Sequence, residues 1–431
     1  MAYAPNVASH LEPAASPTGP LLSRRDLLRG AALGGVGLFL AACGSAVVPS
    51  AERSTEASAG AVTPSAPPSP IATASASVPP PSATVTPTAA AKPPLAERIA
   101  SLLVVGFRGS RLDQTPWIRS ALADSALGGV ILFDRDQQTG GNRNVVSPDQ
   151  VRLLVDEIRG AAGNRPVIVS VDQEGGIVTR LSPTHGFPAL ASEWEIGSSG
   201  DSVGLRWAAT MAKTLSEAGI NLNFAPVVDL KVNPRSPAIG ALDRAFSADP
   251  AVVVHKATVE IDALRGAGIR STLKHFPGIG SSSTNTDFGV ADVTQTWSKT
   301  ELDPFRELIA ADHADLVMAG HVVNGQLDRR RPASLSKPTV TGVLRGQLGF
   351  EGVVVTDDLQ AAAIQKSFGR DEAVVMALDA GNDLLLFANQ QVYEKDVVAR
   401  VVRVVTAAIE SGVLREERID EAWTRVQAAF A

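Results

Sequence analysis

The chain has 431 residues, and 39 Lys and Arg against 45 Asp and Glu give it a formal net charge of −6. This balance argues against a nucleic-acid binder, which would carry a basic patch or domain. A single cysteine excludes a disulfide framework and any multi-cysteine metal site. A hydrophobic content of 45% excludes a wholly disordered chain.

The N-terminus has the pattern of an export signal. Residues 23–29 resemble a twin-arginine signal, and a 12-residue apolar run at 31–42 follows, too short for a membrane-spanning helix of about 20 residues. Residues 40–44 resemble a bacterial lipobox, in which the thiol of Cys43 receives the lipid. We expect residues 1–42 to be a lipoprotein signal peptide, and the mature protein to be lipid-anchored through Cys43 to the outer face of the bacterial cytoplasmic membrane. The alternative is a buried apolar helix with an incidental cysteine.

Residues 43–95 differ in composition from the rest of the chain. Of the 28 prolines, 15 lie in residues 1–95, and no aromatic residue occurs between residues 45 and 94. Such a segment buries too little apolar surface to offset the entropy of ordering it. We expect a disordered linker over 43–95 and one folded domain over 96–431, which contains 34 basic and 41 acidic residues.

Short apolar runs alternate with longer amphipathic runs along this domain. The expected strands are 102–107, 129–133, 166–172, 220–229, 269–276, 315–321, 352–357 and 383–387. The expected helices are 148–161, 203–218, 251–266, 301–311, 339–347, 371–380, 393–410 and 417–429. Eight strand–helix units with nearly continuous apolar strands predict an α/β fold, a (β/α)₈ TIM barrel. A doubly wound open sheet is the alternative.

Charged or imidazole side chains follow five consecutive expected strands. In chain order they are Asp172, Asp229, Lys274 with His275, His321, and Asp357 with Asp358. The carboxyl ends of barrel strands are where active sites form, so this pattern predicts an enzyme. Carboxylates beside Lys, His and Arg suit a neutral polyhydroxylated ligand, and the chain has no Gly-rich phosphate loop.

Three short sequence strings around these residues resemble those of a known protein family. They are Val-Asp-Gln-Glu-Gly-Gly at 171–176, Leu-Lys-His-Phe-Pro-Gly at 273–278 and Val-Thr-Asp-Asp-Leu at 355–359. In this order and spacing they resemble glycoside hydrolase family 3, and most closely its β-N-acetylhexosaminidase branch, over about residues 96–430. Further matches lie at 128–133, 224–229, 244–247 and 332–336.

The resemblance implies a retaining, two-step hydrolase, and nothing in the sequence indicates a nucleotide, flavin or haem cofactor. It implies that Asp357 is the nucleophile that forms the glycosyl-enzyme. It also implies sugar-binding roles for Asp172, Arg180, Arg244, Lys274 and His275. The structural alternatives are helix capping by Asp357 or Asp358, a loop cap at Asp172, a core position for His275, and ion pairs for the two arginines.

The sequence departs from the branch at the general acid/base. Relatives continue from the His-Phe-Pro-Gly string to His-Gly and then to an Asp-Ser-His triplet whose His is the acid/base. Here, without gaps, Asn285 stands in place of that Asp and Asp287 in place of the His, while Ile177 stands where the family often has Arg. Three outcomes are open: Asp287 is the acid/base, another group such as Asp292 supplies the proton, or the protein binds sugar with little turnover.

The expected substrate is a carbohydrate with a terminal N-acetylglucosamine, from cell-wall fragments or other glycans. The chain ends at Ala431, and we expect an open, exo-acting site that holds one terminal sugar. A β-glucosidase of the same family and a sugar-binding lipoprotein are the alternatives. A metal-dependent barrel hydrolase using Asp172, His275, His321 and Asp357 is disfavoured, because no His-x-His pair lies on the first strand.

Overall fold

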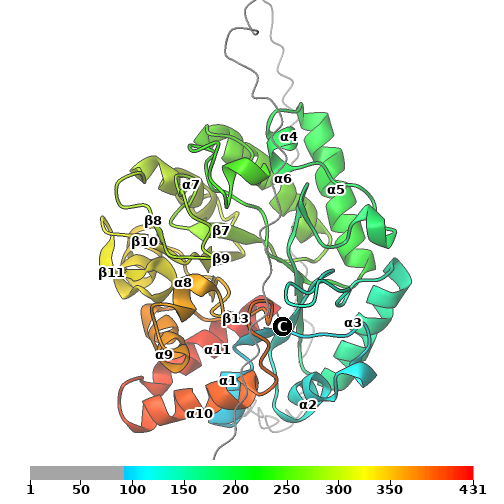
Figure 1. The fold of residues 1–431 in the computed structure, drawn as a ribbon, viewed down its shortest axis with the longest axis vertical. Coiled ribbons are helices and arrows are strands. Elements are labelled where there is room, and N and C mark those ends of the chain that lie inside the picture. Colours follow the sequence, from blue (N-terminus) through cyan, green and yellow to red (C-terminus); the bar gives the residue numbers. More distant parts are fainter. Residues whose placement is uncertain (1–91, 431) are drawn as a thin grey trace, which may run out of the picture. The chain divides into compact units, whose positions relative to one another are not determined.

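The computed structural model describes residues 92–430, and eight parallel strands form the centre of this region (Figure 1). They are β1 (Leu103–Gly106), β2 (Gly129–Leu132), β3 (Ile168–Val171), β6 (Leu222–Asn223), β7 (Thr272–Phe276), β9 (Leu316–Ala319), β12 (Val353–Thr356) and β13 (Leu385–Phe387). Every residue of these strands is buried, because the strands have packed side chains on both faces. Each falls inside a strand expected from the sequence.

The strands close into a barrel in chain order. Hydrogen-bonded pairing gives one run, β13-β1-β2-β3-β6, and a second, β12-β9-β7. Parallel bridges between Leu222 and Arg270 and between Val227 and Lys274 join β6 to β7. A further parallel bridge, from Val355 to Leu384, joins β12 to β13. The expected (β/α)₈ barrel is therefore confirmed, and the open-sheet alternative is not.

Helices form a ring outside these strands (Figure 1). They are α1 (Leu95–Ala100), α2 (Pro116–Asp124), α3 (Pro148–Ala162), α4 (Glu193–Gly197), α5 (Asp201–Glu217), α6 (Pro250–Gly266), α7 (Asp303–Ala310), a π-helix (Pro338–Gln347), α8 (Ala362–Gln365), α9 (Arg370–Ala380), α10 (Val397–Glu410) and α11 (Glu416–Phe430). The side chains of Ser147 and Asp249 cap α3 and α6, each with proline in the first turn, as their sequences favour. All eight expected helices are present, with boundaries shifted by a few residues.

Short strands that the sequence did not predict lie at the carboxyl ends of the barrel strands. β4 (Gln173–Gly175) and β5 (Val178–Thr179) form a hairpin directly after β3. β8 (Ala291–Asp292), β10 (Val322–Asn324) and β11 (Asp328–Pro332) form a separate three-stranded sheet from the loops after β7 and β9. Segments of two to five residues carry too little periodicity to be recognised in a sequence.

The twin-arginine signal, Cys43 and the linker up to residue 91 lie outside the described residues. The described region begins at Lys92, whose ammonium lies 2.8 Å from the Asp420 carboxylate, and α1 begins at Leu95, just before the expected boundary at 96. Within residues 92–430, no helix combines the length and the apolar character needed to cross a bilayer.

Candidate active site

A cavity of about 190 Å³ opens at the carboxyl ends of the barrel strands. All seven pocket residues expected from the sequence line it: Asp172, Arg180, Arg244, Lys274, His275, Asp287 and Asp357. They come from the ends of β3, β7 and β12 and from three loops, so only barrel closure brings them together. The volume lies below the ~300–1,000 Å³ of pockets for drug-sized ligands and suits a single sugar ring.

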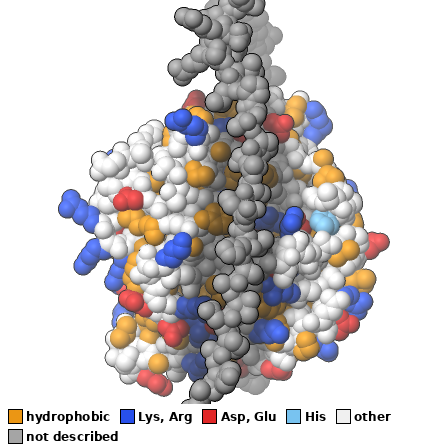
Figure 2. All heavy atoms as spheres, in the orientation of Figure 1, with side chains coloured by type: hydrophobic (Ala, Val, Ile, Leu, Met, Phe, Trp, Pro, Cys, Tyr) orange, Lys and Arg blue, Asp and Glu red, His pale blue; other side chains and the backbone are white. Residues whose placement is uncertain are grey.

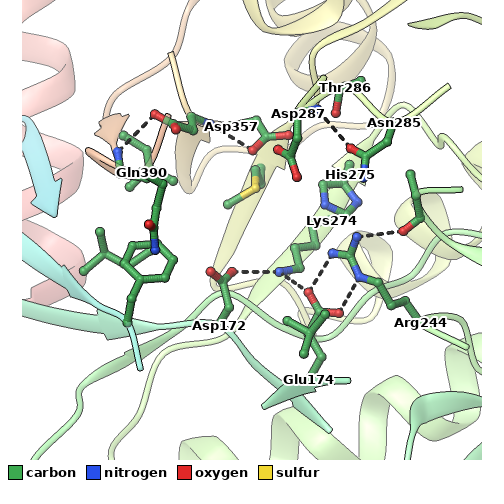
Figure 3. A pocket seen from close by; sticks show the side chains of 18 of the residues that line it. Asp172, Glu174, Arg244, Lys274, His275, Asn285, Thr286, Asp287, Asp357 and Gln390 are labelled. Carbon is green, nitrogen blue, oxygen red and sulfur yellow. Dashed lines mark hydrogen bonds and ion pairs between the residues drawn. The ribbon is translucent and has the colours of Figure 1, made fainter. Parts of the chain in front are cut away.

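One wall of the cavity is a network of buried ion pairs (Figure 3). Glu174 is 1% exposed and accepts two hydrogen bonds of 2.7 Å from the Arg244 guanidinium. The Lys274 ammonium lies 2.6 Å from Glu174 and 3.1 Å from Asp172. Burial alone would raise the pKa of Glu174, but Arg244 and Lys274 outweigh it and hold that pKa far below its ordinary range.

The turn after β3 directs Asp172 into this network. Gly175 has φ +93° and Gly176 has φ +58°, a left-handed conformation that favours glycine. A Cβ atom on Gly175 would lie 2.2 Å from the Ala191 carbonyl oxygen, so no side chain fits there. The tight turn returns the chain as the β4–β5 hairpin, which brings Arg180 within 3.6 Å of the second Asp172 oxygen.

Asp357 follows the last residue of β12 and lies half-buried in the cavity. Its Oδ1 accepts 2.8 Å from the Asp358 amide. Burial opposes ionisation of Asp357, but His321, His275, the Asp358 amide and Lys274 outweigh it and lower the pKa of the carboxyl. An ionised carboxylate in a partly closed pocket has the character of a nucleophile.

Asp287 lies across from the Lys274 network, on the same side of the cavity as Asp357 (Figure 3). Burial raises its pKa, and the negative charge of Asp357 raises it further. The backbone around it is held in place: the carbonyls of Thr286 and Asp287 accept from the amides of Ala363 and Ala362. Asp287 is therefore fixed in the pocket in a setting that favours the protonated acid.

Asp292, the alternative proton donor, lies elsewhere. It is exposed in β8, and its carboxylate accepts 2.9 Å from the Thr294 amide. It lines a separate hollow beside β10 rather than the cavity with Asp357.

Two histidines have partners that settle their orientation. The Nδ1 of His275 lies 2.7 Å from Asp229, so Nδ1 donates and Nε2 is left for the cavity. Asp229 also accepts from the amides of His275 and Ile279, so it supports the start of the loop after β7. His321 is buried behind the cavity, with Nε2 2.7 Å from the Asp358 carbonyl and Nδ1 2.7 Å from the Ser334 hydroxyl. Burial lowers the pKa of His321, and a neutral ring donating from Nε2 fits both contacts.

Comparison with known proteins shows which family has this fold and this arrangement of pocket residues. Residues 94–429 match the profile described as "Glycosyl hydrolase family 3 N terminal domain". This is most of the chain. The chain belongs to glycosyl hydrolase family 3.

Several family 3 relatives are similar over most of the folded region. The "Beta-hexosaminidase" of Tolumonas auensis is 36% identical over 295 residues, which cover 67% of this chain and 83% of that protein. A "Beta-hexosaminidase" of Xanthomonas euvesicatoria is 37% identical over 323 residues, or 73% of this chain and 91% of that protein.

Solved structures of the family share the fold. A β-N-acetylhexosaminidase from Beutenbergia cavernae superposes with a TM-score of 0.70 at 30% identity, over 78% of this chain and 98% of that one. A family 3 β-N-acetylglucosaminidase from Paenibacillus sp. gives 0.71 at 34% identity, although this chain spans only 62% of its length. The chain is thus a glycosidase that acts on O-glycosyl bonds.

The pocket of this family 3 enzyme also contains charged and polar residues for which the sequence predicted no binding or catalytic role. Glu174 lies within the Asp172–Gly176 string, but nothing in the string shows that it pairs with both Lys274 and Arg244. Asp358 lines the cavity, and burial raises its pKa to about 7 while it accepts from the amides of Ala388 and Gln360. The other lining polar residues include Asn285, which stands in place of the family's Asp, and Gln137, Thr286, Gln390 and Gln391, which carry no sequence pattern.

Replacing Glu174 tests the buried network. Glu174→Gln removes the carboxylate that pairs with Arg244 and leaves Lys274 with Asp172 as its bonded counter-charge, so we expect the free energy of unfolding at pH 7 to fall by about 3–5 kcal/mol. Urea unfolding measures this. Glu217→Gln is the matched control, because the ion pair of Glu217 within residues 92–430 is with Lys213 on the exposed face of α5, and a change below ~1 kcal/mol is expected.

The contribution of ionised Glu174 to the free energy of unfolding should depend on pH. Because the folded-state pKa of Glu174 lies below its ordinary 4.5, its contribution is present above pH 4.5 and is lost as the pH falls. The difference between wild type and Glu174→Gln should therefore shrink in acid, and a difference that grows in acid would contradict this account.

Proposed function

We propose that the protein is an exo-acting, retaining β-N-acetylhexosaminidase that releases terminal N-acetylglucosamine from cell-wall fragments or other glycans. The observation that carries the proposal is a pair of carboxyl groups in one cavity with opposite pKa shifts, low at Asp357 and raised at Asp287. Hexosaminidase names among the relatives support the N-acetyl sugar.

The first step uses both groups. The Asp357 carboxylate attacks the anomeric carbon of the bound sugar and forms a covalent bond to it. The bond from that carbon to the leaving oxygen breaks, and Asp287 gives its proton to this oxygen. The raised pKa of Asp287 favours the protonated form that this step needs.

The second step reverses the roles. Asp287, now ionised, takes a proton from a water molecule, and the resulting oxygen attacks the anomeric carbon. The bond to Asp357 breaks, and the sugar leaves with its original anomeric configuration. Two inversions at one carbon give retention.

The remaining charged groups hold the sugar in position. Asp172 and the free Nε2 of His275 accept from sugar hydroxyls, while Lys274, Arg180 and Arg244 donate to hydroxyl oxygens. Their mutual ion pairs fix these side chains before the ligand arrives, which lowers the entropy lost on binding.

We propose in addition that the protein is exported and anchored in the membrane. The twin-arginine string, the apolar run and the lipobox that ends in Cys43 support this proposal by their order and spacing. Lipidation at Cys43 would keep the enzyme at the outer face of the cytoplasmic membrane, close to cell-wall glycans.

Substrate preference and the nucleophile are tested together. Wild-type protein should hydrolyse aryl β-N-acetylglucosaminides faster than the matching β-glucosides; the reverse order would favour the β-glucosidase alternative. Asp357→Asn removes the attacking oxygen anion, so kcat on the better substrate should fall at least ~10³-fold. A fluorinated aryl glycoside should add one sugar to wild type by mass spectrometry and none to Asp357→Asn. Labelling of another residue would remove Asp357 from this role.

Replacing Asp287 tests the acid/base. Asp287→Ala should lower turnover of an unactivated disaccharide by ~10²–10⁴-fold and that of a substrate with an activated leaving group much less. The pH profile of kcat/KM gives the sign: activity of wild type rises as Asp357 ionises and falls as Asp287 loses its proton. The alkaline fall should therefore disappear in Asp287→Ala.

Asp292→Ala is the control for this experiment, because Asp292 is acidic, near in sequence and outside the cavity. It should keep the wild-type rate and both limbs of the pH profile. If Asp292→Ala lost the alkaline fall and Asp287→Ala kept it, the two assignments would be exchanged.

The anchor is tested by mass spectrometry of the mature protein expressed in a bacterial host that lipidates exported proteins. The first residue should be a diacylated Cys43, and Cys43→Ala should release the protein from the membrane fraction. A mature protein that still begins at Met1 would exclude the proposal.

A further inference from the structure

Apart from the cavity, the most unusual charged feature of the described residues lies in the sheet of β8, β10 and β11. β8 follows the loop that carries Asp287, and β10 follows the end of β9. The sheet therefore belongs to the same end of the barrel as the active site, and β11 forms its edge, paired only with β10.

Three consecutive arginines bulge out of this edge strand. The ladder pairs Asn324 with Asp328 and Val323 with Pro332, so one step along β10 corresponds to four along β11. The residues in excess are Arg329, Arg330 and Arg331. A bulge redirects side chains away from the sheet; Arg329 and Arg330 are exposed, and Arg331 is half-buried. Lys and Arg side chains project in Figure 2 from the edge where Figure 1 places β11.

Nearby acids do not neutralise these guanidinium groups. Asp328, at the start of the bulge, accepts instead from the Arg330 amide and the Ser336 hydroxyl, each at 2.9 Å. Asp292 accepts from the Thr294 amide. Within residues 92–430, none of the three arginines forms an ion pair, although acidic residues outnumber basic ones in the folded domain. Three unpaired like charges in a row are therefore available to an external anion.

We propose that this arginine bulge is a docking site for a polyanionic, phosphodiester-linked glycan or polyol polymer. The guanidinium fork matches the oxygens of a phosphate, and three adjacent forks match a ligand with repeating charges. An open hollow of about 590 Å³ beside Arg329 is lined by Thr294, Gln295 and Gln326, whose hydroxyl and amide groups can bond the hydroxyls of such a polymer. The carboxylate of Asp292 at the rim of the hollow repels anions, so the phosphates of the polymer would bind at the arginine bulge and its hydroxyls in the hollow.

A membrane surface is the less favoured occupant. Stable binding to a bilayer interface needs apolar side chains that enter it, and the hollow has only half-buried Val323. Phe288 and Val290 are 66% and 44% exposed just before β8, so anionic vesicles form an arm of the test. A charged edge strand also prevents pairing with other strands, and that role predicts no ligand at all.

The experiment compares three forms of the protein for binding to poly(glycerol phosphate). They are wild type, the triple variant Arg329→Gln/Arg330→Gln/Arg331→Gln, and a control with the same loss of charge, Arg119→Gln/Arg152→Gln/Arg206→Gln, at exposed arginines of α2, α3 and α5. Isothermal titration at several salt concentrations gives Kd and its salt dependence. Turnover of a small neutral aryl glycoside checks that each variant is folded, because neither set touches the cavity.

The bulge variant should bind the polymer at least ~10-fold more weakly at low salt, and its slope of log Kd against log salt should fall by about 2–3. The control should bind like wild type. Equal losses in both variants would show a net-charge effect and overturn the proposal, as would the absence of wild-type binding. Wild-type binding to anionic phospholipid vesicles, with none to the polymer, would assign the surface to a membrane instead. None of these outcomes depends on the catalytic assignments.

Discussion

Glu174 is the carboxylate on which the geometry of the pocket depends. It is removed from water, which is unfavourable for a charge, and three short contacts to Arg244 and Lys274 offset that desolvation. These partners come from the end of β7 and from the loop after β6, so the ion pairs tie three parts of the barrel mouth together. Lys274 also holds Asp172, and Asp172 in turn faces Arg180. The ligand-facing groups are thus positioned by one another rather than by solvent.

The same cluster sets the electrostatics of the reacting groups. Asp357 lies near Lys274 and two histidines, and these outweigh the effect of its burial and favour its anion. That anion, together with burial, favours the protonated form of Asp287. The surroundings thereby shift the pKa values of two identical side chains in opposite directions, as two-step glycoside hydrolysis requires of an acid and a nucleophile.

The sequence lacks the acid/base histidine of the branch that it resembles, and the pocket has features that suit a carboxylic acid instead. A histidine acid is oriented by a partner carboxylate, whereas a carboxylic acid needs burial and a neighbouring negative charge to keep its proton near neutral pH. Asp287 has both. Its loop begins at Ile279, whose amide bonds Asp229, and its backbone bonds to Ala362 and Ala363 close to Asp357. Asp287 is therefore positioned by the segments that follow β7 and β12, the two strands that also supply its neighbours.

The sequence by itself determined the barrel and most of its pocket. Eight apolar runs marked the strands, and charged residues after them marked the carboxyl face, because strand burial and strand ends leave local patterns. The family strings named Asp172, Arg180, Arg244, Lys274, His275 and Asp357 as pocket residues, and the gap-free alignment pointed to Asp287. Only the tertiary structure showed that Asp287 lies inside the cavity and Asp292 outside it, although just five positions of chain separate them.

Pairings between distant segments were also decided by the tertiary structure alone. Glu174 meets Arg244 across 70 positions of chain, and the bulge at residues 329–331 exists only because β11 pairs out of step with β10. A pKa depends on every charge nearby in space, so the opposite shifts of Asp287 and Asp357 required the closed barrel. Local sequence patterns indicate whether a segment forms a strand or a helix. The energy of a buried charge depends instead on the charges that the folded barrel brings close to it.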